Sequence, residues 1–96
     1  MVIARRGARA IIDAGMKSLT NEFGAPMVKD TAIKVAHLSE EHGSVGAGES
    51  SLKPGMKIEI IPSHGDTTIN LHSEYHVVRG DDVIATWPIE GARAYR

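Results

Sequence analysis

Apolar and polar residues alternate along much of the chain with the two-residue period of a β-strand. The clearest case is residues 56–61, in which Met56, Ile58 and Ile60 alternate with Lys57 and Glu59. Successive side chains of a strand point to opposite faces of a sheet, so this segment would bury one face and expose the other. A similar alternation in residues 32–39 predicts another strand.

Two hairpins are predicted from pairs of apolar runs that flank short turns. They consist of residues 2–5 with residues 9–13, and residues 75–78 with residues 83–87. The intervening turns contain Gly7 and Gly80. Glycine readily adopts the left-handed backbone that a tight hairpin turn requires. We therefore expect one hairpin at the start of the chain and another near its end.

The remaining segments are expected to be loops, apart from a single helical turn at residues 67–71. Residues 18–29 are interrupted by Gly24 and Pro26. Residues 43–55 hold four Gly, three Ser and one Pro, a composition typical of an exposed, flexible loop. About six short strands separated by turn residues indicate an all-β fold, a small barrel-like domain with one short helical turn. Ninety-six residues form one domain, residues 1–96.

Composition and charge exclude several classes of function. The net charge of −1 provides no basic face for nucleic acid, and no apolar run approaches the length needed to span a membrane. The chain has no Cys, which excludes disulfides, cysteine-ligated zinc and a thiol nucleophile. We expect a cytoplasmic protein. The chain also opens directly on a predicted strand, so we expect it to be the C-terminal part of a larger protein.

His64 and Asp66 form the most chemically specific feature of the chain. They follow the apolar run and Pro62, and Gly65 separates them. Residues i and i+2 of an extended segment project to the same side, and imidazole nitrogen and carboxylate oxygen are ligands of zinc, manganese and similar ions. The alternative is structural: Asp66 would cap a turn or helix, and His64 would be an ordinary surface residue.

Other histidines could complete such a site. His72 could act as a third ligand. Alternatively, His72 and Asn70 could form a second layer, in which they would hydrogen-bond to the ligands and orient them. The structural alternative for His72 is a hydrogen bond at the end of a loop. His76 is expected in a strand, and His37 and His42 flank two carboxylates, with structural roles expected for all three. The chain contains no glycine-rich loop that ends in Lys-Ser/Thr, so phosphate binding of that kind is unsupported.

Three stretches taken together resemble the C-terminal domain of the D-threonine aldolase and D-serine dehydratase family. They are residues 10–19 (Ala-Ile-Ile-Asp-Ala-Gly-Met-Lys-Ser-Leu), residues 38–43 (Leu-Ser-Glu-Glu-His-Gly), and residues 61–72 with 75–79 and 87–89. The resemblance covers nearly the whole chain, and its motifs agree in order and spacing. Met16 departs from the family pattern, where Ser is expected.

The resemblance implies an enzyme that uses pyridoxal phosphate, bound by an N-terminal β/α barrel that is absent here. It assigns His64 and Asp66 as ligands of a divalent metal, Mn²⁺ or Zn²⁺. The dehydratase branch tends to have Cys at the second ligand position, so Asp66 favours the aldolase branch. We expect no catalytic residue and no cofactor-binding lysine within this chain, and no activity from the chain alone. The expected partners are the barrel domain and a second copy in a homodimer.

The reaction implied is cleavage of D-β-hydroxy amino acids to glycine and an aldehyde, with the metal on the β-hydroxyl group. Two alternatives remain open. The first is a domain of a D-serine dehydratase-type ammonia-lyase, because the same metal could help to expel the hydroxyl group. The second is a non-catalytic β-barrel binding module.

Overall fold

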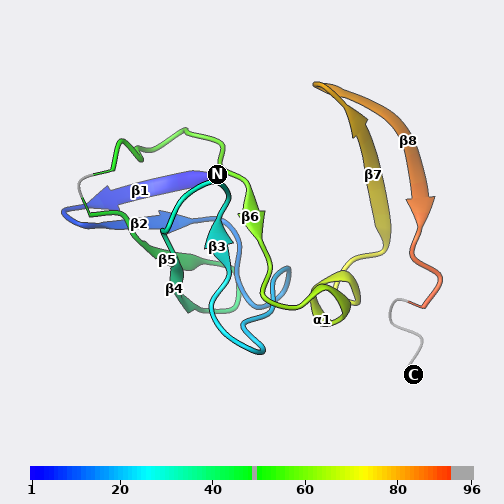
Figure 1. Ribbon diagram of the computed structural model, residues 1–96, viewed down its shortest axis with the longest axis horizontal. Helices are drawn as coiled ribbons and strands as arrows, with labels where there is room; N and C mark the ends of the chain where they lie inside the picture. The colour runs from blue at the N-terminus through cyan, green and yellow to red at the C-terminus, as the bar shows by residue number, and fades with distance from the viewer. Residues whose placement is uncertain (49, 92–96) are drawn as a thin grey trace.

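The computed structural model describes residues 1–48 and 50–91, and these form eight strands and one short helix (Figure 1). In chain order the elements are β1 Val2–Arg6, β2 Arg9–Ile12, β3 Met27–Val28, β4 Val35–Leu38, β5 Gly43–Gly46, β6 Ile60–Ile61, α1 Gly65–Ile69, β7 Glu74–Arg79 and β8 Asp82–Pro88. The fold is mostly β, as expected. Residues 49 and 92–96 of the expected single domain lie outside the described part. The single described helix is too short to cross a membrane.

The largest sheet has four antiparallel strands in the order β1-β2-β5-β4. The predicted first hairpin is confirmed, since β1 pairs with β2 around Gly7, whose φ is +57°. Alternate residues of β2 are buried, namely Ala10 and Ile12, and Val45 of the adjacent β5 is fully buried as well. One face of this sheet therefore carries the core, in agreement with the two-residue period.

The core is completed by segments outside the four-stranded sheet. Val28 of β3, Leu19 and Leu52 join the buried cluster, and β3 pairs with β6 in a separate two-stranded sheet. Of the strand predicted over residues 56–61, only Ile60 and Ile61 form one. Burial still alternates along that segment, because Met56, Ile58 and Ile60 are half-buried and the residues between them are exposed.

The expected barrel is not formed by the described residues, which make three small open sheets. Isolated backbone hydrogen bonds link Val2 of β1 to Met56 (2.9 Å) and Val35 of β4 to Pro26 (2.8 Å), but β3 and β6 pair only with each other and do not extend the four-stranded sheet. The expectation of a flexible loop over residues 43–55 is also wrong in part. Residues 43–46 form β5, where a Cβ on Gly43 would lie 2.9 Å from the carbonyl oxygen of Ala14. Gly43 is thus present because of close packing, so glycine does not mark flexibility here.

Arg5 holds the segment that follows β5. Its guanidinium donates hydrogen bonds to the carbonyl oxygens of Gly48 (2.7 Å), Ser50 (3.2 Å) and Leu52 (2.8 Å). Backbone carbonyl groups that no strand pairs are satisfied in this way. Arg5 therefore has a structural role.

The second predicted hairpin, β7 with β8, is confirmed and extends away from the rest of the molecule (Figure 1). None of its residues is fully buried. Its exposed large apolar side chains are Tyr75, Val78, Val83, Ile84 and Trp87. The expected helical turn is confirmed as α1, which begins two residues earlier than predicted and lies between the body of the molecule and this hairpin.

Candidate metal centre

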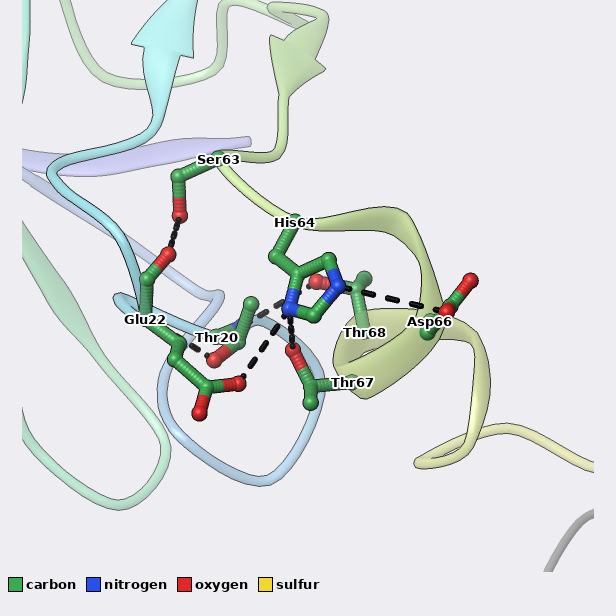
Figure 2. Close-up of polar contacts among 7 residues, drawn as sticks. All are labelled: Thr20, Glu22, Ser63, His64, Asp66, Thr67 and Thr68. Carbon is green, nitrogen blue, oxygen red and sulfur yellow. Dashed lines mark hydrogen bonds and ion pairs between the residues drawn. The ribbon is translucent and has the colours of Figure 1, made fainter.

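His64 and Asp66 lie where the chain leaves β6 and enters α1. Pro62 and Ser63 separate the strand from the helix, and His64 is the residue that precedes the first helical position, with φ −146° and ψ 121°. Asp66 occupies the first helical turn, where a carboxylate is favoured by the partial positive charge of the helix N-terminus. Figure 2 shows the His64 ring turned toward Glu22 and Thr67, and the Asp66 carboxylate at the start of α1, joined to the other ring nitrogen by a dashed line.

The two side chains converge. His64 Nε2 lies 4.0 Å from Asp66 Oδ2, a distance too long for a hydrogen bond. The imidazole is 32% exposed, whereas the Asp66 side chain is 95% exposed. Asp66 therefore keeps its rotamer freedom, and its carboxylate is open to solvent and to anything that binds beside it.

The other nitrogen of His64 faces the protein. Nδ1 lies 3.2 Å from Oε2 of Glu22 and 3.2 Å from Oγ1 of Thr67 (Figure 2). An ionised carboxylate only accepts hydrogen bonds, so the contact with Glu22 requires a proton on Nδ1. In the neutral ring the lone pair then lies on Nε2, the nitrogen that is 4.0 Å from Asp66 Oδ2.

Glu22 is itself held in place by several hydrogen bonds. Its N–H donates to Oγ1 of Thr20 (3.1 Å), and its carbonyl oxygen accepts from the Ser63 hydroxyl (2.7 Å). The N–H of Thr20 donates to Oγ1 of Thr68 in α1 (3.2 Å), and Thr20 is buried. These contacts join residues 20–22 to residues 63–68, which are far apart in the sequence (Figure 2).

Phe23 packs on the same imidazole. Its ring centroid lies 4.9 Å from that of His64, in an edge-to-face arrangement with an interplanar angle of 65°. The backbone of Phe23 is left-handed, with φ +64°, which bulky residues rarely adopt. His64 is thus contacted by two consecutive residues of one loop.

The remaining expected site residues lie elsewhere. His72 Nε2 is 2.8 Å from the carbonyl oxygen of Ser18, so the loop-end hydrogen bond is what the structure shows for this residue. Asn70 ends α1, with its N–H donating to the Asp66 carbonyl oxygen (3.0 Å). Among the polar contacts of residues 1–48 and 50–91, none joins the side chain of His72 or Asn70 to that of His64 or Asp66. The role of both residues in a second layer stays a prediction.

The other histidines are also apart from the site. His76 pairs with Glu74 across 3.1 Å on the exposed hairpin. His37 lies on β4 and His42 in the turn before β5. Lys17 lies 3.0 Å from Glu41 in an exposed ion pair, which lowers the pKa of that carboxyl group.

The donor set fits a divalent ion held by two protein ligands. In the described part of the chain no group of three or more His, Cys, Asp or Glu residues could hold a metal ion. Ligand atoms lie about 2.0–2.2 Å from such an ion, so two donors in tetrahedral geometry are ~3.3–3.6 Å apart. The separation of 4.0 Å between His64 Nε2 and Asp66 Oδ2 is longer than this, and rotation of the exposed carboxylate can shorten it. Other positions would be open to water or substrate.

Sequence reasoning did not identify Glu22. It lies 42 residues before His64, in a segment interpreted as an ordinary loop, and the sequence contains no periodic signal that links them. The local signal in the sequence is Gly24, which predicts a turn near Glu22; in the structure Phe23 and Gly24 both have positive φ.

Comparisons with known proteins agree on one family. Residues 1–78 match the family model described as "Putative serine dehydratase domain". The chain is 37% identical over 82 residues to the 3-hydroxy-D-aspartate aldolase of Paracoccus denitrificans, covering 83% of this chain and 21% of that protein. It is 37% identical over 84 residues to the D-threonine aldolase of an Arthrobacter species, covering 84% of this chain and 22% of that protein.

The fold has a match among solved structures. The crystal structure of D-threonine aldolase from Filomicrobium marinum superposes with a TM-score of 0.83 at 33% sequence identity, covering 96% of this chain and 27% of that chain. The chain thus spans about a fifth of the length of the curated relatives that it matches.

Proposed function

Because the chain belongs to the serine dehydratase domain family, as the C-terminal domain found in D-threonine aldolase and 3-hydroxy-D-aspartate aldolase, we propose that it is the metal-binding domain of a lyase. The proposed reaction cleaves D-β-hydroxy amino acids to glycine and an aldehyde. The enzyme would comprise this domain and an N-terminal barrel that binds pyridoxal phosphate. The observation that supports the metal role most directly is the convergence of His64 Nε2 and Asp66 Oδ2 to 4.0 Å.

Each residue of the site has a defined task in this proposal. His64 offers the Nε2 lone pair, and Asp66 offers a carboxylate oxygen from the first turn of α1. When bound, a divalent ion supplies Lewis acidity toward the substrate hydroxyl group, and pyridoxal phosphate supplies an electron sink. The two protein ligands would hold the ion in place and leave its other positions open for the substrate hydroxyl group.

The second candidate is the ammonia-lyase reaction of a D-serine dehydratase, for which the matching family is named. The two reactions differ in which bond at Cα breaks, and we propose that the choice is made by a base outside this chain. Asp66 favours the aldolase, because the resemblance associates an aspartate at this position with the aldolase branch. A carboxylate in place of a thiolate also suits harder ions such as Mn²⁺. A non-catalytic β-barrel module is less well supported, since the named relatives of this chain are aldolases.

We also propose that the apolar hairpin β7–β8 docks on the N-terminal barrel domain. Two-stranded hairpins are marginally stable in water, and this one exposes Tyr75 (42%), Val78 (61%) and Trp87 (57%). The curated relatives are several times longer than this chain, so the full-length protein would contain further chain to cover these side chains. A homodimer and a cytoplasmic location complete the proposal.

The reaction is tested by turnover of the full-length protein with D-threonine and D-serine, with products separated by chromatography. We expect glycine and acetaldehyde from D-threonine, loss of activity with a chelator, and recovery with Mn²⁺. His64→Ala should lower kcat/KM by at least about 100-fold, because replacing even an outer partner of a metal ligand costs 10- to 100-fold.

His37→Ala is the control, since His37 is an exposed histidine on β4, apart from both the metal centre and the hairpin. It should leave turnover nearly unchanged. Activity that resists both chelation and His64→Ala would contradict the proposed metal role, and keto acid with ammonia as the main products would favour the ammonia-lyase.

A further inference from the structure

We propose that Glu22 is the positioning residue of the metal centre: it selects the tautomer of His64 and aims the Nε2 lone pair toward Asp66. The inference rests on the proposed function, because His64 is taken as a metal ligand. A neutral imidazole binds a metal through only one of its nitrogens, and the hydrogen bond made by the other nitrogen decides which one is free.

The geometry around the ring supports this role. Nδ1 has two partners, the Glu22 carboxylate and the Thr67 hydroxyl, each at 3.2 Å. The hydroxyl can donate or accept, so alone it would allow either tautomer, whereas the carboxylate accepts only. Glu22 therefore supplies the selectivity. Within the described residues, Nε2 has no partner nearer than Asp66 Oδ2 at 4.0 Å.

Backbone hydrogen bonds of Glu22 hold this residue beside His64. The Glu22 N–H donates to the Thr20 hydroxyl, and the Glu22 carbonyl oxygen accepts from the hydroxyl of Ser63, which directly precedes His64 in the chain. The loop and the ligand segment are thus held to each other, which keeps the Glu22 carboxylate within reach of the imidazole. A ligand held in its binding orientation loses less conformational entropy when the ion binds.

The loop conformation has a cost that is consistent with this role. Phe23 adopts φ +64° and its side chain is 81% exposed, so burial of its own ring does not explain the backbone. The conformation does place the Phe23 ring against the imidazole at 4.9 Å while the preceding residue contacts Nδ1. His64 is held both by an edge-to-face ring contact and by a hydrogen bond.

The test reads the tautomer first, in the metal-free chain, by nitrogen NMR of ¹⁵N-labelled histidine above the pH at which imidazole titrates. We expect His64 to carry its proton on Nδ1 in the native chain. Glu22→Ala should move the population toward the Nε2–H form that free histidine favours, while circular dichroism shows an unchanged fold. Glu22→Gln should retain part of the native tautomer, because its amide oxygen still accepts.

The second measurement is the Mn²⁺ affinity of the same variants, obtained by titration. Glu22→Ala should weaken Mn²⁺ binding by about 10- to 100-fold. Glu74→Gln is the matched control, because among the described residues Glu74 forms the other close carboxylate–histidine pair, with His76 at 3.1 Å. It should change neither the His64 tautomer nor the Mn²⁺ affinity.

A native His64 protonated on Nε2, or a tautomer unchanged by Glu22→Ala, would overturn the inference whatever the metal titration shows. In the second case Thr67→Val identifies the hydroxyl as the partner that matters. Failure of the proposed function looks different: the His64 tautomer would respond to Glu22, but Mn²⁺ would bind equally well to the native chain and to His64→Ala.

Discussion

At the residue scale, the centre combines restrained and free ligands. His64 is contacted by Glu22, Thr67 and Phe23, whereas the Asp66 side chain is 95% exposed and approaches His64 only to 4.0 Å, beyond hydrogen-bond distance. The left-handed backbone of Phe23 costs about 1–3 kcal/mol, which other contacts of the loop must offset. One pre-oriented nitrogen and one mobile oxygen suit an ion whose other positions are filled by water or substrate.

The sequence predicted only part of this centre. His64 and Asp66 could be identified because both lie in one short segment, where spacing alone controls the relative direction of the side chains. Glu22 could not, since its position depends on how two distant loops pack and hydrogen-bond. The same limit applies to His72, whose bond with the Ser18 carbonyl group is a long-range contact. The metal role itself stays a prediction.

At the scale of elements, two of the motifs that suggested the family contact each other directly. Met16 and Lys17 donate backbone hydrogen bonds to the carbonyl oxygens of Ser39 (2.8 Å) and Glu40 (3.0 Å). Between these segments lies Gly15, where a Cβ would be 2.5 Å from the His42 nitrogen and 2.6 Å from the Glu40 carbonyl oxygen. The glycine therefore allows a turn after β2 to pack on the turn between β4 and β5.

Gly15→Ala should destabilise the chain by roughly 1–3 kcal/mol, because backbone atoms block the added methyl group and the two turns must separate. Chemical denaturation measures the difference in free energy of unfolding. Gly46→Ala is the matched control: it lies in β5 with open space at its Cβ, and it should be neutral or slightly stabilising. Equal stability of the native chain and Gly15→Ala would contradict the close packing.

The elements predicted correctly are those whose sequence signal lies within a few neighbouring residues. Both hairpins are set by apolar runs on either side of a glycine turn, and α1 follows directly from the residues after Pro62. β5 was not predicted, because Gly43 and Gly46 are typical of loops unless the neighbouring strands are known. The expectation of a barrel was wrong for the same reason. Closure of a barrel depends on which strands pair, and the sequence of a short strand such as β3 does not indicate its partner.

At the scale of the whole molecule, the chain consists of a packed body and a hairpin that extends from it (Figure 1). The body contains every residue of the buried hydrophobic cluster. The hairpin instead exposes the cross-strand pair Val78 (61%) and Val83 (59%) near its turn. Such a surface is expected at an interface, which agrees with the proposal that the rest of the enzyme covers it.

In the 96-residue chain, this uncovered surface should cause self-association that increases with concentration in sedimentation velocity. Replacing both Val78 and Val83 with Thr keeps β-propensity but removes apolar area, so the variant should associate less. Ile3→Thr is the control, because Ile3 is an exposed apolar residue (44%) on β1 of the body. A clean monomer at high concentration would count against the docking proposal.

The central claim is that His64 and Asp66 bind one divalent ion together. Calorimetric titration of the metal-free full-length protein with Mn²⁺ and Zn²⁺, compared with His64→Ala and Asp66→Ala, tests it most directly. We predict one ion bound per chain in the native protein and a much weaker or absent binding heat in each variant. Indistinguishable titrations of the native protein and both variants would contradict the claim.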